Sequence, residues 1–231
     1  MSKKYQDYVE VVYNEENRPL TGYPNKLAQY LFSRYGINTG QKLLDIGCGR
    51  GEFLQGFINC GCKGFGVDRS SMAQKYCPQA DLRVVDLESS QLPFDDNFFD
   101  VVYSKSVIEH FYFPEKLVKE MYRVLKPGGI LLTLCPDWEF NYRIYFEDYT
   151  HRTPFMQSSL HDIQLIHGFE KINVERFRQL PILWGNGKML TPLAEMTRVF
   201  SPRFLGKYSK WVRFSKEIML LSSSIKPKDT K

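Results

Sequence analysis

Short apolar runs alternate with segments of helical periodicity over the first 136 residues. The first run is Leu43–Ile46, and further runs cover residues 65–68, 82–87 and 98–104. The segment 114–125 instead spaces its apolar side chains at the three- and four-residue intervals of an amphipathic helix. Alternating strands and helices with short loops require crossover connections between parallel strands. The pattern therefore predicts an α/β fold whose ligand lies beyond the carboxyl ends of the strands.

The second half of the chain continues this pattern less regularly. Residues 126–129 (Lys-Pro-Gly-Gly) are expected to end the helix and to start a fifth strand at 130–134. A sixth strand is expected at 169–177, and a last one at 217–221 with the serines that follow. Between them lies a long segment, 181–216, with apolar and aromatic residues at helical spacing. The pattern thus predicts a helical insert before the last strand.

An acid and three alternating glycines mark the end of the first strand. Asp45 stands two residues before Gly47, and Gly49 and Gly51 complete a GxGxG turn into the next helix. Without a Cβ these glycines can adopt positive φ and let a ligand lie against the main chain, toward which the helix points its amides. An acid here repels the pyrophosphate of a dinucleotide but suits a ligand with an ammonium group. The turn therefore points to S-adenosyl-L-methionine (SAM) and argues against a nicotinamide dehydrogenase.

Two further acids end the second and third apolar runs. Asp68 lies 23 residues after Asp45, and its carboxylate can accept hydrogen bonds from both ribose hydroxyls. Asp86 ends the third run, where it can accept from an adenine amino group. Because the strands are expected to be parallel, these carboxylates should lie at the same edge of the sheet as the glycine turn.

The order and spacing of these motifs resemble those of the class I SAM-dependent methyltransferases, in particular the type 11 group of small-molecule enzymes. The resemblance covers residues 41–136 and is carried by LLDIGCGRGEF, GVD, DLESSQLPFDDNFFDVVYS, SVIEH and EMYRVLKPGG. It implies a Rossmann-like, seven-stranded, mostly parallel sheet with an antiparallel last strand, helices on both faces and a helical cap inserted before the last strand. This resemblance identifies the cofactor but gives almost no information about the acceptor.

The resemblance also implies which residues bind the cofactor, SAM, which leaves as S-adenosyl-L-homocysteine. They are Asp45, Gly47, Cys48, Gly49, Gly51, Asp68, Arg69, Asp86, Leu87, Ser104 and Tyr13. Tyr13 belongs to an N-terminal segment that is expected to fold as a lid, where an aromatic ring can stack beside the methionine moiety. Ordinary helix packing explains this tyrosine equally well.

Length and composition fit a single methyltransferase domain over residues 1–231. Hydrophobic residues make up 43% of the chain, enough for one well-filled core. Because there is no run of about 18 apolar residues and no apolar signal core, we expect a cytoplasmic protein. Its expected parts are lid helices (1–40), the SAM-binding core (41–136), the acceptor loop with a helix and strand six (137–180), the insert (181–216) and the last strand with its tail (217–231).

The cysteines are odd in number and show neither two CxxC pairs nor a nearby histidine set. Simple packing near a turn explains Cys60 and Cys62 better than a redox or metal motif does. We therefore expect reduced, largely buried thiols at Cys48, Cys60, Cys62, Cys77 and Cys135.

Positive charge is concentrated at the end of the chain. The net charge is +5, and residues 171–231 hold 13 Lys or Arg against 4 Asp or Glu. In the insert, basic side chains alternate with aromatic ones, which suits a cap that meets an anionic acceptor or the inner face of a membrane. A helical pair packed on the sheet, with solvated lysines, explains the same pattern. The chain has no RNA-binding signature and no Asn-Pro-Pro-Tyr-like turn after the fourth strand, so nucleic acid is not an expected partner.

Methyl transfer from a sulfonium depends mainly on alignment and desolvation, but a hydroxyl acceptor must also lose its proton. Histidine is the usual base near neutral pH. His151, in the polar loop after the fifth strand, is the first candidate for general base, with Asp148 or Glu147 as its orienting partner, and His110 is the second. For each histidine the alternative is a structural role in its loop. A divalent ion on Asp137, Asp148 and His151 is conceivable, but we predict no metal.

The expected substrate-binding residues are Tyr103, Arg143, Arg152 and Trp184, because the two arginines can clamp a phosphate or carboxylate of the acceptor. The loop sequence DYTHRTPF and the insert resemble methyltransferases of capsule and O-antigen gene clusters. That resemblance implies O-methylation of a sugar or phosphate-bearing intermediate of bacterial surface polysaccharide, either small or lipid-linked. The alternatives are quinone, lipid or natural-product acceptors, and a SAM-binding scaffold without turnover.

Overall fold

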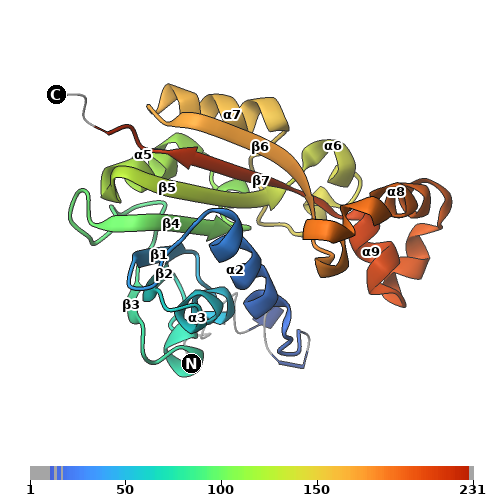
Figure 1. Ribbon diagram of the computed structural model, residues 1–231, viewed down its shortest axis with the longest axis horizontal. Helices are drawn as coiled ribbons and strands as arrows, with labels where there is room; N and C mark the ends of the chain where they lie inside the picture. The colour runs from blue at the N-terminus through green and yellow to red at the C-terminus, as the bar shows by residue number, and fades with distance from the viewer. Residues whose placement is uncertain (1–10, 13–14, 17, 229–231) are drawn as a thin grey trace, which may run out of the picture. The chain divides into compact units, whose positions relative to one another are not determined.

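The computed structural model describes residues 11–12, 15–16 and 18–228 (Figure 1). Its strands are β1 (Lys42–Ile46), β2 (Lys63–Asp68), β3 (Asp81–Val84), β4 (Phe99–Lys105), β5 (Leu125–Pro136), β6 (Glu170–Arg178) and β7 (Ile218–Ile225). Its α-helices are α2 (Tyr23–Arg34), α3 (Glu52–Asn59), α4 (Ala73–Tyr76), α5 (Pro114–Val124), α6 (Trp138–Asn141), α7 (Gln157–Ile166), α8 (Thr191–Phe200) and α9 (Lys210–Lys216). Short 3₁₀ helices are η1 (Ile108–His110), η2 (Tyr145–Glu147), η3 (Pro181–Leu183), η4 (Gly185–Leu190) and η5 (Arg203–Lys207).

The strands form one sheet in the order β3-β2-β1-β4-β5-β7-β6. β1 pairs in parallel with β2 and β4, and β2 pairs in parallel with β3. β7 runs antiparallel to β6. Ile46 lies opposite Val67 of β2 and Ser104 of β4, so these three strands end at one edge. The sheet confirms the expected Rossmann-like fold with an antiparallel last strand.

The described residues group into two compact units. One comprises the residues up to 104 together with 123–130, and the other comprises 105–122 together with the residues from 131 onward. Strand β5 contributes residues to both units. The interpretation of residues 1–231 as a single domain stays a prediction.

In the first unit, helix α2 packs closely against α3 (Figure 1). Gly56 of α3 allows this approach, since a Cβ on this residue would lie 2.7 Å from the Cβ of Ala28 in α2. Leu31 of α2 and Phe57 of α3 are fully buried. The apolar contact between the two helices fixes α3, and therefore the glycine-rich turn that precedes it.

The start of β5 differs from the sequence expectation. Strand β5 begins at Leu125, directly after α5, so that residues 126–129 lie inside the strand rather than before it. The reason is local pairing, because the backbone N–H of Phe98 already donates to the carbonyl of Val124 at 2.8 Å. The Pro-Gly-Gly segment therefore forms an irregular beginning of the strand, with Gly128 at φ 81°.

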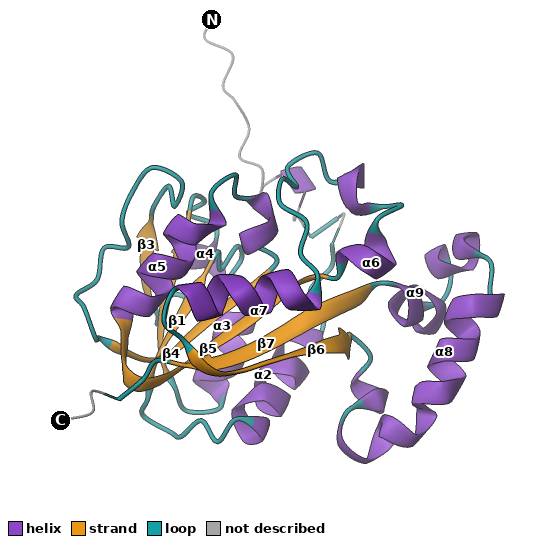
Figure 2. Cartoon of the chain, turned by 90° about the horizontal axis from the view of Figure 1, so that it is seen from above, coloured by secondary structure: helices purple, strands orange, loops and turns teal. Residues whose placement is uncertain are grey.

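In the second unit, helix α7 lies along β6 in both views (Figures 1 and 2). Asp137, which is 1% exposed, follows β5 and begins α6. Its carboxylate accepts hydrogen bonds from the backbone N–H of Glu139 at 3.1 Å and from Nε of Arg176 at 3.0 Å. Because both oxygens of this buried group are used, Asp137 has a structural role at the end of β5.

The insert between β6 and β7 is helical, as expected from its apolar periodicity. It contains η3, η4, α8, η5 and α9, and Figures 1 and 2 show α8 and α9 side by side beyond the ends of β6 and β7. A small apolar cluster holds it together, formed by Leu180, Leu183, Ala194, Trp211 and Phe214. Within residues 11–12, 15–16 and 18–228, no helix combines the length and apolar character needed to cross a bilayer.

Candidate active site

The glycine-rich turn connects β1 to α3 in the first unit. Gly47, Gly49 and Gly51 have φ values of 70°, 53° and 79°, a region that L side chains rarely adopt. A Cβ placed on Gly49 would meet no atom within 4 Å, so this side of the turn is open. Gly51 is the N-cap of α3, whose first-turn amides have no acceptor within the helix. The turn therefore offers main-chain donors to a ligand, as the sequence pattern predicts.

Asp68, at the end of β2, ties the turn to the neighbouring strand. Its carboxylate accepts a hydrogen bond from the backbone N–H of Gly49 at 2.7 Å and one from that of Ser70 at 2.9 Å. The side chain is half-buried. The structure thus gives Asp68 an organising contact with the turn, while its bond to ribose hydroxyls stays a prediction.

Buried polar groups lie along β1 and β4. Asp45 is 2% exposed and raises the pKa of the buried Tyr103 hydroxyl in addition to the larger effect of burial. The ring of Tyr103 packs against Phe57, with centroids 5.0 Å apart. Ser104 is fully buried, and its Oγ finds no hydrogen-bond partner among the residues that the structure describes. An unpaired buried hydroxyl at the end of a strand fits the binding of a polar ligand there.

The other residues expected to bind the cofactor include Arg69, Asp86, Leu87, Cys48 and Tyr13. Asp86 follows β3 and accepts from the backbone N–H of Glu88 at 3.2 Å, while Nε of Arg69 lies 3.9 Å from its Oδ1. Burial, followed by the charge of Asp45, raises the pKa of the Cys48 thiol, so this residue stays protonated. All cysteines are free thiols, and only Cys60 is not buried. The roles expected for Asp86 and Leu87 stay predictions, and Tyr13 lies outside the described residues.

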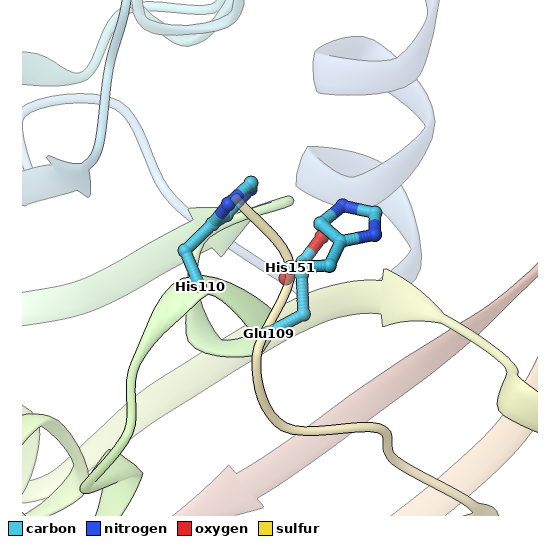
Figure 3. A group of neighbouring side chains, drawn as sticks. All are labelled: Glu109, His110 and His151. Carbon is cyan, nitrogen blue, oxygen red and sulfur yellow. The ribbon is translucent and has the colours of Figure 1, made fainter. Parts of the chain in front are cut away.

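Two histidines and a glutamate form a cluster in the second unit (Figure 3). Glu109 and His110 lie in η1, directly after β4, and His151 lies in the loop that follows η2. The ring centroids of the histidines are 4.8 Å apart, with an interplanar angle of 61°. One nitrogen of each ring and one carboxylate oxygen of Glu109 lie within 4.8 Å of one another. Figure 3 shows these side chains converging from the two segments.

Hydrogen bonds fix the orientation of both imidazoles. Nδ1 of His151 lies 2.6 Å from the carbonyl oxygen of Tyr145. A carbonyl oxygen only accepts, so Nδ1 carries the proton and the neutral ring keeps a lone pair on Nε2. For His110, Nδ1 lies 2.9 Å from Oγ of Thr150, whose hydroxyl donates to Asp148 at 2.6 Å. Because this hydroxyl gives its only proton to Asp148, its oxygen accepts from His110. Nδ1 of His110 therefore carries the proton, and Nε2 has the lone pair.

Glu109 is the most confined member of the cluster. It is 1% exposed, and neither carboxylate oxygen has a hydrogen-bond partner among the described residues. Burial raises the pKa of this carboxyl to about 8, against the lowering effects of its own backbone N–H and of the Lys105 charge. Burial also lowers the pKa of His110, with a further contribution from His151. The carbonyl of Glu109 accepts from the backbone N–H groups of Arg152 and Thr153, which holds the loop against η1.

The structure therefore brings together His110, His151 and Asp148, but with partners other than those expected. The orienting acceptor of His151 Nδ1 is a backbone carbonyl rather than a carboxylate. Asp148 is instead linked to His110 through Thr150. Asp137, weighed as a metal ligand with Asp148 and His151, binds Arg176. The general-base role of His151 stays a prediction.

The expected substrate-binding residues lie in different surroundings. Arg152 follows His151 and donates to the carbonyls of Tyr149 and His151 at 2.5 and 3.0 Å. Arg143 is exposed, and its Nε donates to the hydroxyl of Tyr142 at 2.8 Å. Trp184 stacks on Phe177 at the base of the insert and donates to the carbonyl of Arg178. The substrate-binding roles of Arg143, Arg152 and Trp184, like that of Tyr103, stay predictions.

Three residues in or next to the cluster were not expected from the sequence, namely Glu109, Thr150 and Tyr145. One signal was present for Glu109, since an acid and a histidine stand between the apolar residues Ile108 and Phe111 a few positions after a buried strand. Thr150 and Tyr145 gave no comparable signal, because they act through a single hydroxyl and a backbone carbonyl.

Comparisons with known proteins bear on the fold and on the cofactor. A family model described as a methyltransferase domain matches residues 44–133. The sterol 24-C-methyltransferase of Schizosaccharomyces pombe is 34% identical over 110 residues, which cover 44% of this chain and 29% of that protein. The chain spans less than half the length of the curated relatives that it matches.

Solved methyltransferase structures share the fold over most of the chain. A methyltransferase solved with the Haloferax volcanii Trm112 activator has a TM-score of 0.71 at 20% identity, covering 97% of this chain and 100% of that one. Haemonchus contortus phosphoethanolamine N-methyltransferase 2, in complex with phosphomonomethylethanolamine and S-adenosylhomocysteine, has a TM-score of 0.62 at 23% identity, covering 87% and 52%. The family match makes residues 44–133 similar to the SAM-dependent methyltransferases, whose cofactor is SAM, and the solved structures show that the chain shares the class I methyltransferase fold.

Proposed function

We propose that this chain is a cytoplasmic enzyme that transfers a methyl group from SAM to a hydroxyl of a small or lipid-linked acceptor. The acceptor that we propose is a sugar or phosphate-bearing intermediate of bacterial surface polysaccharide. We propose a hydroxyl as the acceptor group because of the neighbouring imidazoles of His110 and His151. In each ring Nδ1 is hydrogen-bonded and Nε2 is available. A nitrogen lone pair held in place is what removal of a hydroxyl proton requires.

The proposed step is an in-line displacement at the methyl carbon. The acceptor oxygen forms the new O–C bond, and the electron pair of the broken S–C bond stays on sulfur, which becomes the neutral thioether of S-adenosyl-L-homocysteine. The hydroxyl proton passes to Nε2 of His151. The carbonyl of Tyr145 supports this role, because it stabilises the imidazolium by accepting from Nδ1–H.

The cations of the second unit favour an anionic acceptor. Arg152 adjoins His151 in sequence, and its backbone N–H is bonded to the carbonyl of Glu109. Exposed basic residues of the insert, Arg203, Lys207, Lys210 and Arg213, belong to the same unit. A phosphate or sugar phosphate is the acceptor group that such cations recognise.

Methyl-labelled SAM tests the proposal directly. The protein and an Asp45→Ala control would be incubated with cell extract, and label would be followed into aqueous, lipid-linked and macromolecular fractions. We expect label in sugar phosphates or lipid-linked glycans with the wild-type protein, and a large loss with Asp45→Ala, because the variant lacks the acid beside the glycine turn. Label in nucleic acid or protein alone would contradict the proposal.

Apolar acceptors such as quinones or other lipids are the second candidate. The insert exposes apolar side chains, among them Met189 at 88% and Phe200 at 78%, and one relative is named a sterol methyltransferase. Asp45-dependent label in apolar lipids would establish this alternative. The absence of Asp45-dependent label from every fraction would instead indicate a SAM-binding scaffold without turnover.

We further propose that the insert contacts the anionic inner face of the membrane, where lipid-linked acceptors reside. Its exposed surface combines apolar side chains with cations, which is the composition of an interfacial contact. The exposed apolar residues are Met189, Leu193, Met196, Val199, Phe200, Phe204 and Tyr208, and the exposed cations are Arg203, Lys207, Lys210 and Arg213.

Replacing Lys207, Lys210 and Arg213 with alanine together is expected to weaken binding to phosphatidylglycerol vesicles by roughly 100-fold, at about 1 kcal/mol per cation near the surface. Co-sedimentation with vesicles measures the affinity. The control replaces Lys26, Lys63 and Lys75, three exposed lysines of the other unit, and should bind as the wild type does. If both triple variants lose the same affinity for the vesicles, net charge alone explains the effect and the membrane proposal is wrong.

A further inference from the structure

We propose that Glu109, His110 and His151 bind a divalent transition-metal ion. From the sequence we expected no metal, and the convergence of these three side chains changes that expectation (Figure 3). Two imidazole nitrogens and one carboxylate oxygen lie within 4.8 Å of one another, contributed by η1 and by the loop after η2. This is the two-histidine, one-carboxylate donor set of many catalytic metal sites.

The partners of the ring nitrogens support the assignment. A histidine that binds a metal almost always donates its other N–H to a carbonyl, a carboxylate or a water, which fixes the ring. His151 shows this arrangement directly, with Nδ1 on the carbonyl of Tyr145. In His110, Nδ1 contacts the hydroxyl of Thr150, which in turn donates to the carboxylate of Asp148. Both Nε2 atoms are therefore held with their lone pairs available for coordination.

The carboxylate of Glu109 provides an independent observation. The side chain is 1% exposed, and its oxygens have no hydrogen-bond partner among the residues that the structure describes. Burying a carboxyl group without partners is costly, and buried charges are normally paired or bound to metals. A cation between Glu109 and the imidazoles supplies the missing partner.

The donor types select the kind of ion. Mg²⁺ and Ca²⁺ prefer oxygen ligands, whereas imidazole suits Zn²⁺, Co²⁺ and related first-row ions. Metal–ligand bonds of about 2.0–2.2 Å place the donor atoms about 3–4 Å from one another. Small side-chain rotations can bring them there from their present separations of up to 4.8 Å. Three protein ligands leave a fourth position open, and that position can take an oxygen of the acceptor.

The role of the ion in turnover rests on the proposed function. Coordination lowers the pKa of a bound hydroxyl, so that the acceptor loses its proton to solvent water before it attacks the methyl carbon. The ion then takes over from His151 the task of generating the alkoxide, because both Nε2 atoms serve as ligands. Binding of the ion itself depends on the cluster alone.

A titration of the full-length, chelator-treated protein with Co²⁺ tests the proposal, with visible absorption as the readout. We expect one equivalent to bind with a ligand-field band. His151→Ala and Glu109→Gln should each weaken binding by more than about 100-fold, and Thr150→Val, which keeps all three ligands, by about 10- to 100-fold. His161→Ala is the matched control, because His161 lies in α7 beside Asp162 and outside the cluster.

The result that would overturn the inference is Co²⁺ binding that is absent from the wild type, or that survives both ligand substitutions in variants whose circular dichroism is native. Equal losses with His161→Ala would overturn it as well. Methyl transfer from labelled SAM is measured separately, on the chelated protein and on the same protein after Co²⁺ is added back. A protein that binds Co²⁺ but transfers no methyl group in either state supports the site and contradicts the proposed function. A protein that is active in both states but binds no Co²⁺ supports the proposed function and overturns the site.

Discussion

Replacing His151 with alanine is expected to lower turnover on the true acceptor by roughly 10²–10⁴-fold while leaving the affinity for SAM unchanged. The loss follows from removing the Nε2 lone pair that the Tyr145 carbonyl holds in place through Nδ1. Initial rates with labelled SAM give turnover, and equilibrium dialysis gives the affinity. The same direction is expected whether Nε2 acts as a base or as a metal ligand, and chelation distinguishes the two roles.

A matched control for His151→Ala is His167→Ala. His167 also bonds through Nδ1 to a backbone carbonyl, that of Ile163 at 2.8 Å, but it lies at the end of α7. This variant should keep the wild-type rate. An unaltered rate in His151→Ala would demote the residue to a structural part of the loop, and a joint loss of SAM affinity would point to misfolding instead.

Replacing Asp68 with alanine is expected to weaken SAM binding by about 2–4 kcal/mol, or roughly 30- to 900-fold in Kd, because two charge-assisted hydrogen bonds to the ribose are lost. Isothermal titration calorimetry measures the affinity. Asp81→Ala is the control, since Asp81 is an acid of the same unit that pairs with Arg83 on the surface.

Asp68 also accepts a hydrogen bond from Gly49, so its replacement can weaken SAM binding through the turn as well as through the ribose. A second ligand is therefore needed to measure the contribution of the ribose hydroxyls alone. S-Adenosylhomocysteine and its 2′-deoxy analogue differ by one hydroxyl. The wild type should prefer the complete ligand, and Asp68→Ala should bind the two almost equally, because the partner of that hydroxyl is gone. If the variant retains the wild-type preference, Asp68 supports only the turn through Gly49, and the ribose assignment is wrong.

The glycine-rich turn and Asp68 could be predicted from the sequence because their geometry is local. Gly47, Gly49 and Gly51 lie within five residues, and the strand pattern places Asp68 at the end of the strand beside them. The backbone conformation that these glycines allow is nearly independent of the rest of the chain. The alternation of apolar runs likewise predicted where most of the strands lie along the chain.

The contacts within the cluster of Glu109, His110 and His151 could not be predicted to the same depth. His110 and Thr150 are 40 residues apart, and only the folded loop brings them within hydrogen-bond distance. The expected Asp148–His151 pairing used proximity in sequence, but the chain turns so that Nδ1 of His151 meets the carbonyl of Tyr145. Side-chain partners in an irregular loop depend on its backbone path, which no periodicity specifies.

The hydrogen bond that orients His151 comes from a main-chain atom, and this limits what a mutational scan can detect. Alanine at position 145 removes the tyrosine ring but leaves its carbonyl oxygen, which is the acceptor for Nδ1. The chain can therefore vary in side chain at this position without losing the acceptor. Only a change of the backbone itself, such as an ester in place of the 145–146 amide, weakens the acceptor and exposes its contribution.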